Sequence, residues 1–209
     1  MHPLKSLLSK TTLLVCFFLC ILLIPLQSNS EKIFKAGFAM VDITPPPGIP
    51  MWGYGARHDL LSTGTKIPLY FKVVVFDDGV DRIAVGGLDL GRSPTQRSFQ
   101  NILERVKNND NVNMVMLVGS HTHHGPVIEL IDEPDCGKGK FELAIKYVED
   151  LENKICQAIH EATLSLTPAK IGWISIDTDL NRNRVSKKPV KMRDPELTVI
   201  RIDSLDNRP

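Results

Sequence analysis

The sequence predicts an α/β protein in which a mixed β-sheet is flanked by helices. Two patterns predict this class. Apolar, β-branched runs alternate with segments of helical periodicity, and a hairpin-like pair of runs precedes a continuous apolar run over residues 113–118. The chain of 209 residues is long enough for one domain of ordinary size with a hydrophobic core.

The positions of the predicted elements follow from where the apolar runs end. The Pro45-Pro46-Pro47-Gly48 stretch ends the first strand, and Asp77-Asp78-Gly79 forms the turn of a hairpin. Helical spacing of apolar residues indicates two amphipathic helices. Strands are expected over 33–44, 70–76, 82–88, 113–118, 169–177 and 197–202, and helices over 94–108 and 141–165.

The first thirty residues have the pattern of an export signal. Lys5 and Lys10 precede an unbroken apolar run over 13–26, and Ser28-Asn29-Ser30 offers a small-residue cleavage site. The apolar run is shorter than the roughly 20 residues that span a bilayer comfortably. We therefore expect a signal peptide over 1–30, with an uncleaved anchor as the alternative, and an exported protein that is secreted, periplasmic or membrane-associated.

The net charge bears on the class of binding partner, and the cysteine content bears on whether a disulfide can form. The formal net charge of +1 gives no basis for a nucleic-acid partner. Once the signal is removed, Cys136 and Cys156 are the remaining cysteines. Export permits a disulfide between them, and two free thiols are the equally weighted alternative.

The strongest functional motif is the histidine turn, residues 120–126, with the sequence Ser-His-Thr-His-His-Gly-Pro. It follows the apolar run over 113–118, which we expect to be a strand covered on both faces. If extended geometry continues, His121 and His123 point to the same side and converge on one ion. We interpret the turn as half of a zinc site, with a hydrogen-bonding or general-base role as the alternative.

Three further groups are candidate site residues. Trp52 and Tyr54 lie in a glycine-rich loop that either covers a pocket or is pinned to the core. Asp89 follows a buried strand, where it either orients a metal-binding histidine or has a structural role such as capping a helix. Arg182 and Arg184 can bind a carboxylate, a phosphate or a developing oxyanion, with a solvated loop as the alternative.

Several blocks of the sequence resemble blocks in the amino-terminal part of the neutral/alkaline, non-lysosomal ceramidase family, and they occur in the same order along the chain. Each block alone is weak, but together they cover nearly all of the chain beyond residue 30. The histidine turn is similar to the family's T-H-T-H-S-G-P block, with departures at Ser120 and His124. The other blocks are Gly37 with Val41-Asp42-Ile43-Thr44-Pro45 and Pro50-Met51-Trp52-Gly53-Tyr54, then Leu88-Asp89, then Asn181-Arg182-Asn183-Arg184.

The resemblance implies a zinc amidase that splits ceramide into a sphingoid base and a fatty acid, with a membrane surface as a possible setting. It implies that His121 is a zinc ligand and that His123 lies beside the scissile amide, where it bonds the substrate or transfers a proton. One of Arg182 and Arg184 would contact the oxyanion or the substrate. We expect substrate contacts from Trp52, Tyr54 and His124 as well, and zinc-bound water as the nucleophile.

The resemblance also predicts an incomplete site. In the family the other zinc ligands (a histidine, a glutamate and a tyrosine) come further along than Pro209. We therefore expect residues 31–209 to be the amino-terminal part of a larger ceramidase-like catalytic domain, as a fragment, a split gene or a decayed relative. A downstream chain would then complete the site, and this chain alone would bind zinc weakly and show little amidase activity.

Two other functions compete with the amidase. One is an exported, non-catalytic relative that binds a lipid or a partner while keeping the fold. The other is a different metallohydrolase with an H-x-H site. Gly125-Pro126 argues against the metallo-β-lactamase pattern, because an Asp-His pair belongs at that place, and an amidohydrolase needs a barrel of about 250 residues.

Overall fold

The computed structural model describes residues 32–57, 60–129, 141–190 and 192–206. The signal peptide or anchor expected over 1–30 and the residue Cys136 lie outside this range. Cys156 is described as a buried free thiol, and burial raises its pKa. The described part of the chain contains no helix that is long and apolar enough to cross a membrane.

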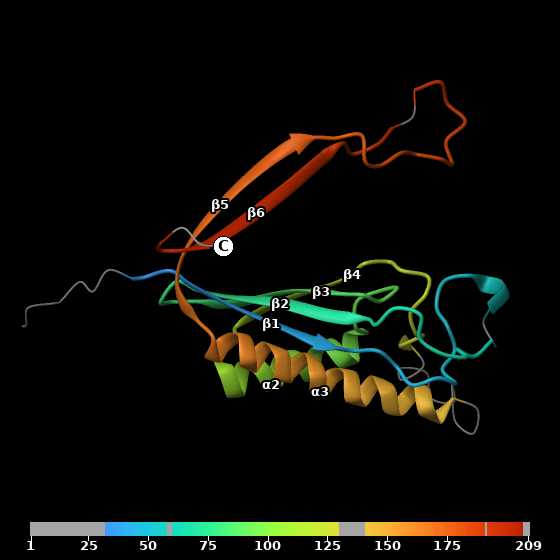
Figure 1. Ribbon diagram of the computed structural model, residues 1–209, viewed down its shortest axis with the longest axis horizontal. Coiled ribbons are helices and arrows are strands. Elements are labelled where there is room, and N and C mark those ends of the chain that lie inside the picture. The colour runs from blue at the N-terminus through green and yellow to red at the C-terminus, as the bar shows by residue number, and fades with distance from the viewer. Residues whose placement is uncertain (1–31, 58–59, 130–140, 191, 207–209) are drawn as a thin grey trace, which may run out of the picture. The chain divides into compact units, whose positions relative to one another are not determined.

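Six strands form one mixed, curled sheet in the order β4-β3-β2-β1-β5-β6 (Figure 1). All neighbouring strands are antiparallel except β3 and β4, which are parallel. The pairing of β1 with β5 involves only the start of each strand, so the β5–β6 hairpin bends away from the other four strands. The strands are β1 (Lys35–Asp42), β2 (Tyr70–Asp77), β3 (Arg82–Leu88), β4 (Met114–Gly119), β5 (Thr167–Asp177) and β6 (Glu196–Ser204).

Two helices lie on the same face of the sheet (Figure 1), α2 (Gln96–Asp110) and α3 (Glu142–Leu164). Helix α2 begins later than the sequence predicts because Thr95 is its cap: the Thr95 side chain accepts a hydrogen bond from the Ser98 N–H. It ends at Asn111, whose left-handed conformation (φ 54°) terminates the helix. A 3₁₀ turn, η1 (Gly55–Arg57), lies in the glycine-rich loop.

The hydrophobic core fills the space between the helices and strands β1 to β4. Tyr147 of α3 adds a polar link, because its hydroxyl donates a 2.6 Å hydrogen bond to the Ile43 carbonyl. Each fully buried aliphatic or phenyl side chain stabilises the fold by about 1.5–3 kcal/mol. The largest fully buried side chains include Phe71, Val73, Val75, Leu88, Ile102, Leu151, Ile155 and Ile159.

Strand β4 differs from the prediction that it is covered on both faces. Val115 and Leu117 are buried under the helices, but Met114, Met116 and Val118 are 59%, 57% and 47% exposed. The reason is that both helices lie on one face of the sheet and β4 is an edge strand of it. The apolar run of β4 therefore has one face covered by the helices and one face that is apolar but exposed. Phe38 and Met40 of β1 are exposed on this open face as well.

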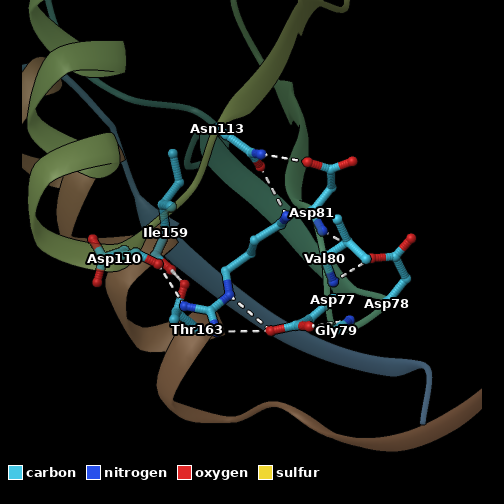
Figure 2. A network of polar contacts seen from close by, with 10 residues as sticks. Asp77, Asp78, Gly79, Val80, Asp81, Asp110, Asn113, Ile159 and Thr163 are labelled. Carbon is cyan, nitrogen blue, oxygen red and sulfur yellow. Dashed lines mark hydrogen bonds and ion pairs between the residues drawn. The ribbon is translucent and has the colours of Figure 1, made fainter. Parts of the chain in front are cut away.

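The amino-terminal ends of β3 and β4 are tied together by a polar network (Figure 2). Arg82 donates to Asp77 through Nε (3.0 Å) and Nη2 (2.7 Å), and its Nη1 donates to the Asp110 carbonyl. Asn113 accepts from the Arg82 N–H and donates to the Asp81 carboxylate. The predicted hairpin turn is thus confirmed, and it is joined to the start of β4 and the end of α2.

Candidate functional site

The histidine turn begins where the extended chain ends. Ser120 still pairs with β3, because its N–H donates to the Leu88 carbonyl at 2.9 Å. The His121 N–H donates to the Leu90 carbonyl at 3.0 Å, but His121 itself has a left-handed backbone with φ 61°. Such a conformation costs a non-glycine residue about 1–3 kcal/mol and is concentrated at functional sites. Extended geometry therefore does not continue through the two histidines.

The two imidazole rings nevertheless lie side by side. The ring centroids of His121 and His123 are 5.2 Å apart, with 63° between the ring planes. The Nδ1 atom of His121 is 3.1 Å from the Gly91 carbonyl oxygen. Because a carbonyl only accepts, this contact assigns the proton to Nδ1 and leaves the Nε2 lone pair of His121 available to a metal ion or a proton. The two rings are therefore neighbours through a turn and not through extended geometry, and their convergence on one ion stays a prediction.

Two aromatic side chains surround the imidazoles. The Trp52 ring lies edge-on to both histidines, with centroid distances of 5.0 Å to His121 and 5.2 Å to His123. The Tyr54 ring packs at 4.8 Å against His123 and carries the Arg57 guanidinium 4.5 Å from its centroid. The glycine-rich loop therefore covers the histidine pair itself. Direct substrate contact by Trp52 and Tyr54 stays a prediction.

Backbone pairing explains how the glycine-rich loop reaches the histidine turn. The Trp52 N–H donates to the Gly125 carbonyl at 2.9 Å, and the Val127 N–H donates to the Pro50 carbonyl at 2.9 Å. Met51 and Pro126 form an antiparallel bridge between these bonds. Two segments that are far apart in the sequence thus run beside each other as a short ladder.

Two glycines make room for the rings. A Cβ atom at Gly91 would lie 2.2 Å from Cε3 of Trp52, and one at Gly53 would lie 2.5 Å from Cγ of His123. Gly53 also has φ 111°, a conformation that disfavours any residue with a side chain. Close packing of the ring cluster, which consists of Trp52, Tyr54, His121 and His123, therefore requires glycine at both positions.

Three charged residues support the cluster without having been singled out from the sequence. Glu129 accepts a 2.7 Å hydrogen bond from Trp52 Nε1 and forms a 3.1 Å ion pair with Arg92. Arg57 Nη2 donates a 2.5 Å hydrogen bond to the His123 carbonyl. Glu129 lies in a stretch that has the composition of a solvated acidic loop, and its partner Trp52 is 77 residues away. No local pattern signals such a contact.

Glu129 is ionised at neutral pH. Burial raises the pKa of its carboxyl group, but hydrogen bonds from Arg92, its own backbone, Trp52 and Ile128 outweigh this effect, and the net pKa is lowered. The site thus contains a fixed negative charge behind the indole.

The structure places Asp89 in a structural position. Its Oδ2 accepts a 3.0 Å hydrogen bond from the Tyr70 N–H and so closes the pairing of β2 with β3. The partner of the His121 ring is the Gly91 carbonyl. The orienting role that the sequence suggested for Asp89 therefore falls to a backbone carbonyl two residues later, a contact that residue type cannot predict.

The other side of the histidine turn opens into a cavity of about 640 Å³. Ser120, Thr122 and His124 are among its lining residues, whereas His121 and His123 are not. Most of the remaining wall is apolar, formed by side chains such as Ile49, Met51, Ile67 and Leu69. This size and lining suit a small apolar ligand. A substrate contact by His124 stays a prediction, and the cavity gives it a location.

Arg182 and Arg184 are not brought to the histidine pair. They line a separate surface recess with Asp179 and Arg193, in the connection between β5 and β6. That connection is held by its own bonds, including an Arg193–Asp179 ion pair of 2.5 Å. Within the part of the chain that the structure describes, no hydrogen bond or ion pair links Arg182 or Arg184 to the histidine turn. Arg57 is the arginine that contacts it.

A complete metal site is not formed by the described residues. They contain no group of three or more His, Cys, Asp or Glu side chains placed to hold one ion. A catalytic zinc normally has three protein ligands and a water molecule. His121, with its oriented ring and free Nε2, fits the role of one ligand, and the set as a whole does not fit a closed site.

Comparison with known proteins gives a result at the level of structure. No protein-family model matches the sequence, and no curated protein matches it. Among solved structures, a ceramidase complexed with C2 aligns with a TM-score of 0.68 and 20% identity, over 85% of this chain and 30% of that chain. The fold is that of part of a ceramidase.

A second solved structure agrees. The neutral ceramidase from Pseudomonas aeruginosa aligns with a TM-score of 0.68 and 19% identity, over 86% of this chain and 31% of that chain. The chain therefore spans about 30% of the length of the ceramidases it matches. At this identity the alignment establishes the ceramidase fold, and it confirms the predicted α/β class with a mixed sheet.

Proposed function

We propose that this chain supplies the histidine half of a zinc-dependent amide hydrolase site of the neutral ceramidase type, acting on N-acylsphingosine or a related lipid amide. The observation that carries the proposal is the His121–His123 pair, 5.2 Å between centroids, at the end of β4 in a ceramidase fold. The His121 Nδ1 contact with Gly91 supports a metal-binding role, because a metal-binding histidine typically donates its other ring N–H to an oxygen.

The remaining ligands are proposed to come from outside the described residues, either from further sequence or from a second chain. The incomplete ligand set and the coverage of about 30% of the matching ceramidases support this proposal. When bound, zinc would supply a water molecule of lowered pKa. The chain's own contribution is to orient His121, to hold His123 beside it, and to pack Trp52 and Tyr54 against the two imidazoles.

His123 is proposed to contact the substrate amide or to transfer a proton. Its ring is enclosed by Trp52, Tyr54 and His121, and its backbone carbonyl is held by Arg57. These contacts restrict its orientation, as a general acid or base requires. Arg57 is a positive group in direct contact with this residue. A role for Arg182 or Arg184 would require the β5–β6 connection to approach the histidine turn.

The proposal is tested by zinc titration and by ceramide hydrolysis with the purified chain. We expect weak zinc binding that His121→Ala abolishes and His160→Ala leaves unchanged, because His160 is bound to Asp110 at 2.6 Å on the α2–α3 side. We expect little hydrolysis unless a protein carrying the missing ligands is added. Zinc affinity that is the same in the wild type and in His121→Ala would contradict the proposal.

A non-catalytic role in binding a lipid or a partner is the second candidate. The cavity of about 640 Å³ and the incomplete ligand set favour it for this chain alone. The two functions separate in one variant. In an enzyme completed by the missing ligands His121→Ala removes all turnover, whereas a binding protein keeps its affinity for a fluorescent fatty-acid probe.

We also propose that the protein acts after export, at or near a membrane surface. The support is the signal-like sequence over 1–30. Fractionation of cells that express the chain, followed by amino-terminal sequencing, tests this. A mature protein that starts near Glu31 in the exported fraction is the expected result.

A further inference from the structure

Glu129 contacts the ring cluster from behind and uses both of its carboxylate oxygens. Oε1 accepts from Trp52 Nε1 at 2.7 Å and pairs with Arg92 Nη1 at 3.1 Å. Oε2 accepts from the Ile128 N–H at 3.0 Å. The Glu129 side chain is 27% exposed, so these bonds are partly shielded from water. A carboxylate with this many partners is held in one place.

The indole of Trp52 is packed against Gly91 and the two imidazoles, and its ring nitrogen adds a directional contact. The hydrogen bond from the Trp52 N–H to Gly125 fixes the backbone, but the ring can still rotate about its two side-chain torsions. Packing over Gly91 limits that rotation on one side. Within that packing, the bond from Nε1 to Glu129 is the hydrogen bond that fixes the direction of the indole edge.

The indole in turn determines the space available to the histidines. Its centroid lies 5.0 Å from His121 and 5.2 Å from His123, so it contacts both rings of the pair. Rotation of the indole would open room for either imidazole to turn. His121 would keep its bond to Gly91, whereas among the described residues His123 is held by ring contacts and by the Arg57 bond to its backbone carbonyl.

We propose that Glu129 is a positioning residue that, by holding the Trp52 indole, sets the spacing and orientation of His121 and His123. Arg92 holds the Glu129 carboxylate from the solvent side. The importance of this for chemistry rests on the proposed function. The arrangement of Glu129, Trp52, His121 and His123 does not depend on that function, because these contacts require neither a bound metal nor turnover.

The first test compares Glu129→Ala with a matched control, Asp77→Ala. Both variants remove a carboxylate that pairs with an arginine, but Asp77 lies at the opposite end of β2 and β3 from the histidine turn. NMR would follow the imidazole ring resonances of His121 and His123 and their cross-relaxation with the Trp52 ring. We expect Glu129→Ala to weaken the cross-peaks and shift both imidazoles, and Asp77→Ala to leave them unchanged. Unchanged resonances in Glu129→Ala would overturn the proposal.

The second test separates positioning from a general loss of stability. Trp52→Phe removes the ring N–H but keeps an aromatic ring, so Glu129→Ala in that background should add no further shift of the imidazole resonances. Independent, additive shifts would show that Glu129 acts by another route and would overturn the proposal. If Glu129→Ala does not fold, Trp52→Phe alone decides, since imidazole resonances that stay unchanged in it contradict the proposed link.

Zinc affinity provides a third readout. Loss of an orienting contact near a metal ligand typically costs 10–100-fold in affinity, and because Glu129 acts through Trp52 we expect about a tenfold loss. Glu129→Gln keeps an oxygen for the Trp52 N–H and should lose less. Absence of zinc binding in the wild type would count against the proposed function only, whereas unchanged ring contacts in Glu129→Ala would count against the positioning role only.

Discussion

The two ends of strands β3 and β4 are built in different ways. At the amino-terminal end, Arg82 joins Asp77, Asp110 and Asn113 in a hydrogen-bonded network within and between adjacent elements (Figure 2). At the carboxyl end, aromatic edges surround His121 and His123, and the charged pair Arg92–Glu129 stands behind them. The amino-terminal end is held by an ion pair and by hydrogen bonds to backbone groups, whereas the carboxyl end is held mainly by the packing of aromatic and imidazole rings.

The two ends also differ in whether their polar side chains are fully engaged in hydrogen bonds. In the amino-terminal network the Asp77 carboxylate and the Arg82 guanidinium are both engaged, with side chains only 18% and 25% exposed. At the carboxyl end the ring nitrogen His121 Nε2 keeps an open lone pair, His121 is exposed, and its backbone is in a costly conformation. We infer that the first end stabilises the sheet, whereas the second leaves an imidazole open to solvent.

The largest expected effect is a difference between the two histidines. His121→Ala should reduce zinc affinity by at least about 100-fold, because it removes the oriented ligand. His123→Ala should reduce it by less than about tenfold while removing ceramide hydrolysis in a completed enzyme. Calorimetric zinc titration of both variants checks this. Equal losses would show that both imidazoles bind the metal, and the assignment of His123 to the substrate side would then be wrong.

Next in size is the effect of filling the space under the indole. Gly91→Ala places a methyl group 2.2 Å from the present position of Trp52 Cε3, so either the ring or the backbone has to move. We expect a loss of about 2–3 kcal/mol in the free energy of unfolding, as for other overpacked sites. Urea denaturation measures it. Gly87→Ala, where an added Cβ meets no atom within 4 Å, is the matched control and should have a much smaller effect.

A smaller loss is expected from the amino-terminal network. Asp77→Ala removes the 2.7 Å and 3.0 Å bonds to Arg82, and bonds to a charged group contribute about 1.5–3 kcal/mol where they are shielded. With both partners partly exposed we expect about 1–2 kcal/mol of destabilisation and no change in zinc affinity. A change in zinc affinity would mean that the two ends of the strands are coupled and do not act independently.

The smallest effect is the pH dependence that both ends share. A hydrogen bond from Arg82 is the main cause of the lowered pKa of Asp77, and the net pKa of Glu129 is lowered although burial opposes this. A pKa that is lower in the folded protein stabilises it fully above the ordinary values of 3.8 and 4.5, and the gain is lost as pH falls below them.

Thermal unfolding between pH 7 and pH 2 checks this prediction. The melting temperature of the wild type should fall below about pH 4.5 more steeply than that of the double variant Asp77→Asn, Glu129→Gln. Parallel curves would show that neither carboxylate contributes to acid unfolding.

Much of the fold was predictable because the residues that each strand or helix buries recur with the period of that element, and this period can be seen in the sequence. All six strands and both helices lie where alternation and helical spacing place them, with ends that differ by a few residues. Proline runs and the Asp-Asp-Gly turn act within a few residues, so a single sequence contains the information needed to place them. The proximity of His121 and His123 was also predictable because one residue separates them, although the extended geometry expected for them is absent.

Contacts over long separations were not predictable in this way. The left-handed backbone of His121 accompanies a bond to Leu90, which lies 31 residues earlier, and the turn is followed by the ladder between 50–52 and 125–127. The charge behind the indole depends on Glu129 meeting Trp52 across 77 residues. The doubled Asn-Arg motif at 181–184 attracted attention by composition, yet the bending of β5–β6 places it in a separate recess.

The sequence by itself determined the α/β class, the order of the elements and the presence of paired histidines after β4, because these depend on short-range periodicity and spacing. The tertiary structure alone decided which face of β4 is covered and which carbonyl orients His121. It also decided that Glu129, Arg92 and Arg57 surround the site in place of Arg182 and Arg184. The physical reason is that burial periodicity is a property of each segment, whereas a binding site is made by side chains that only the packing of several segments brings together.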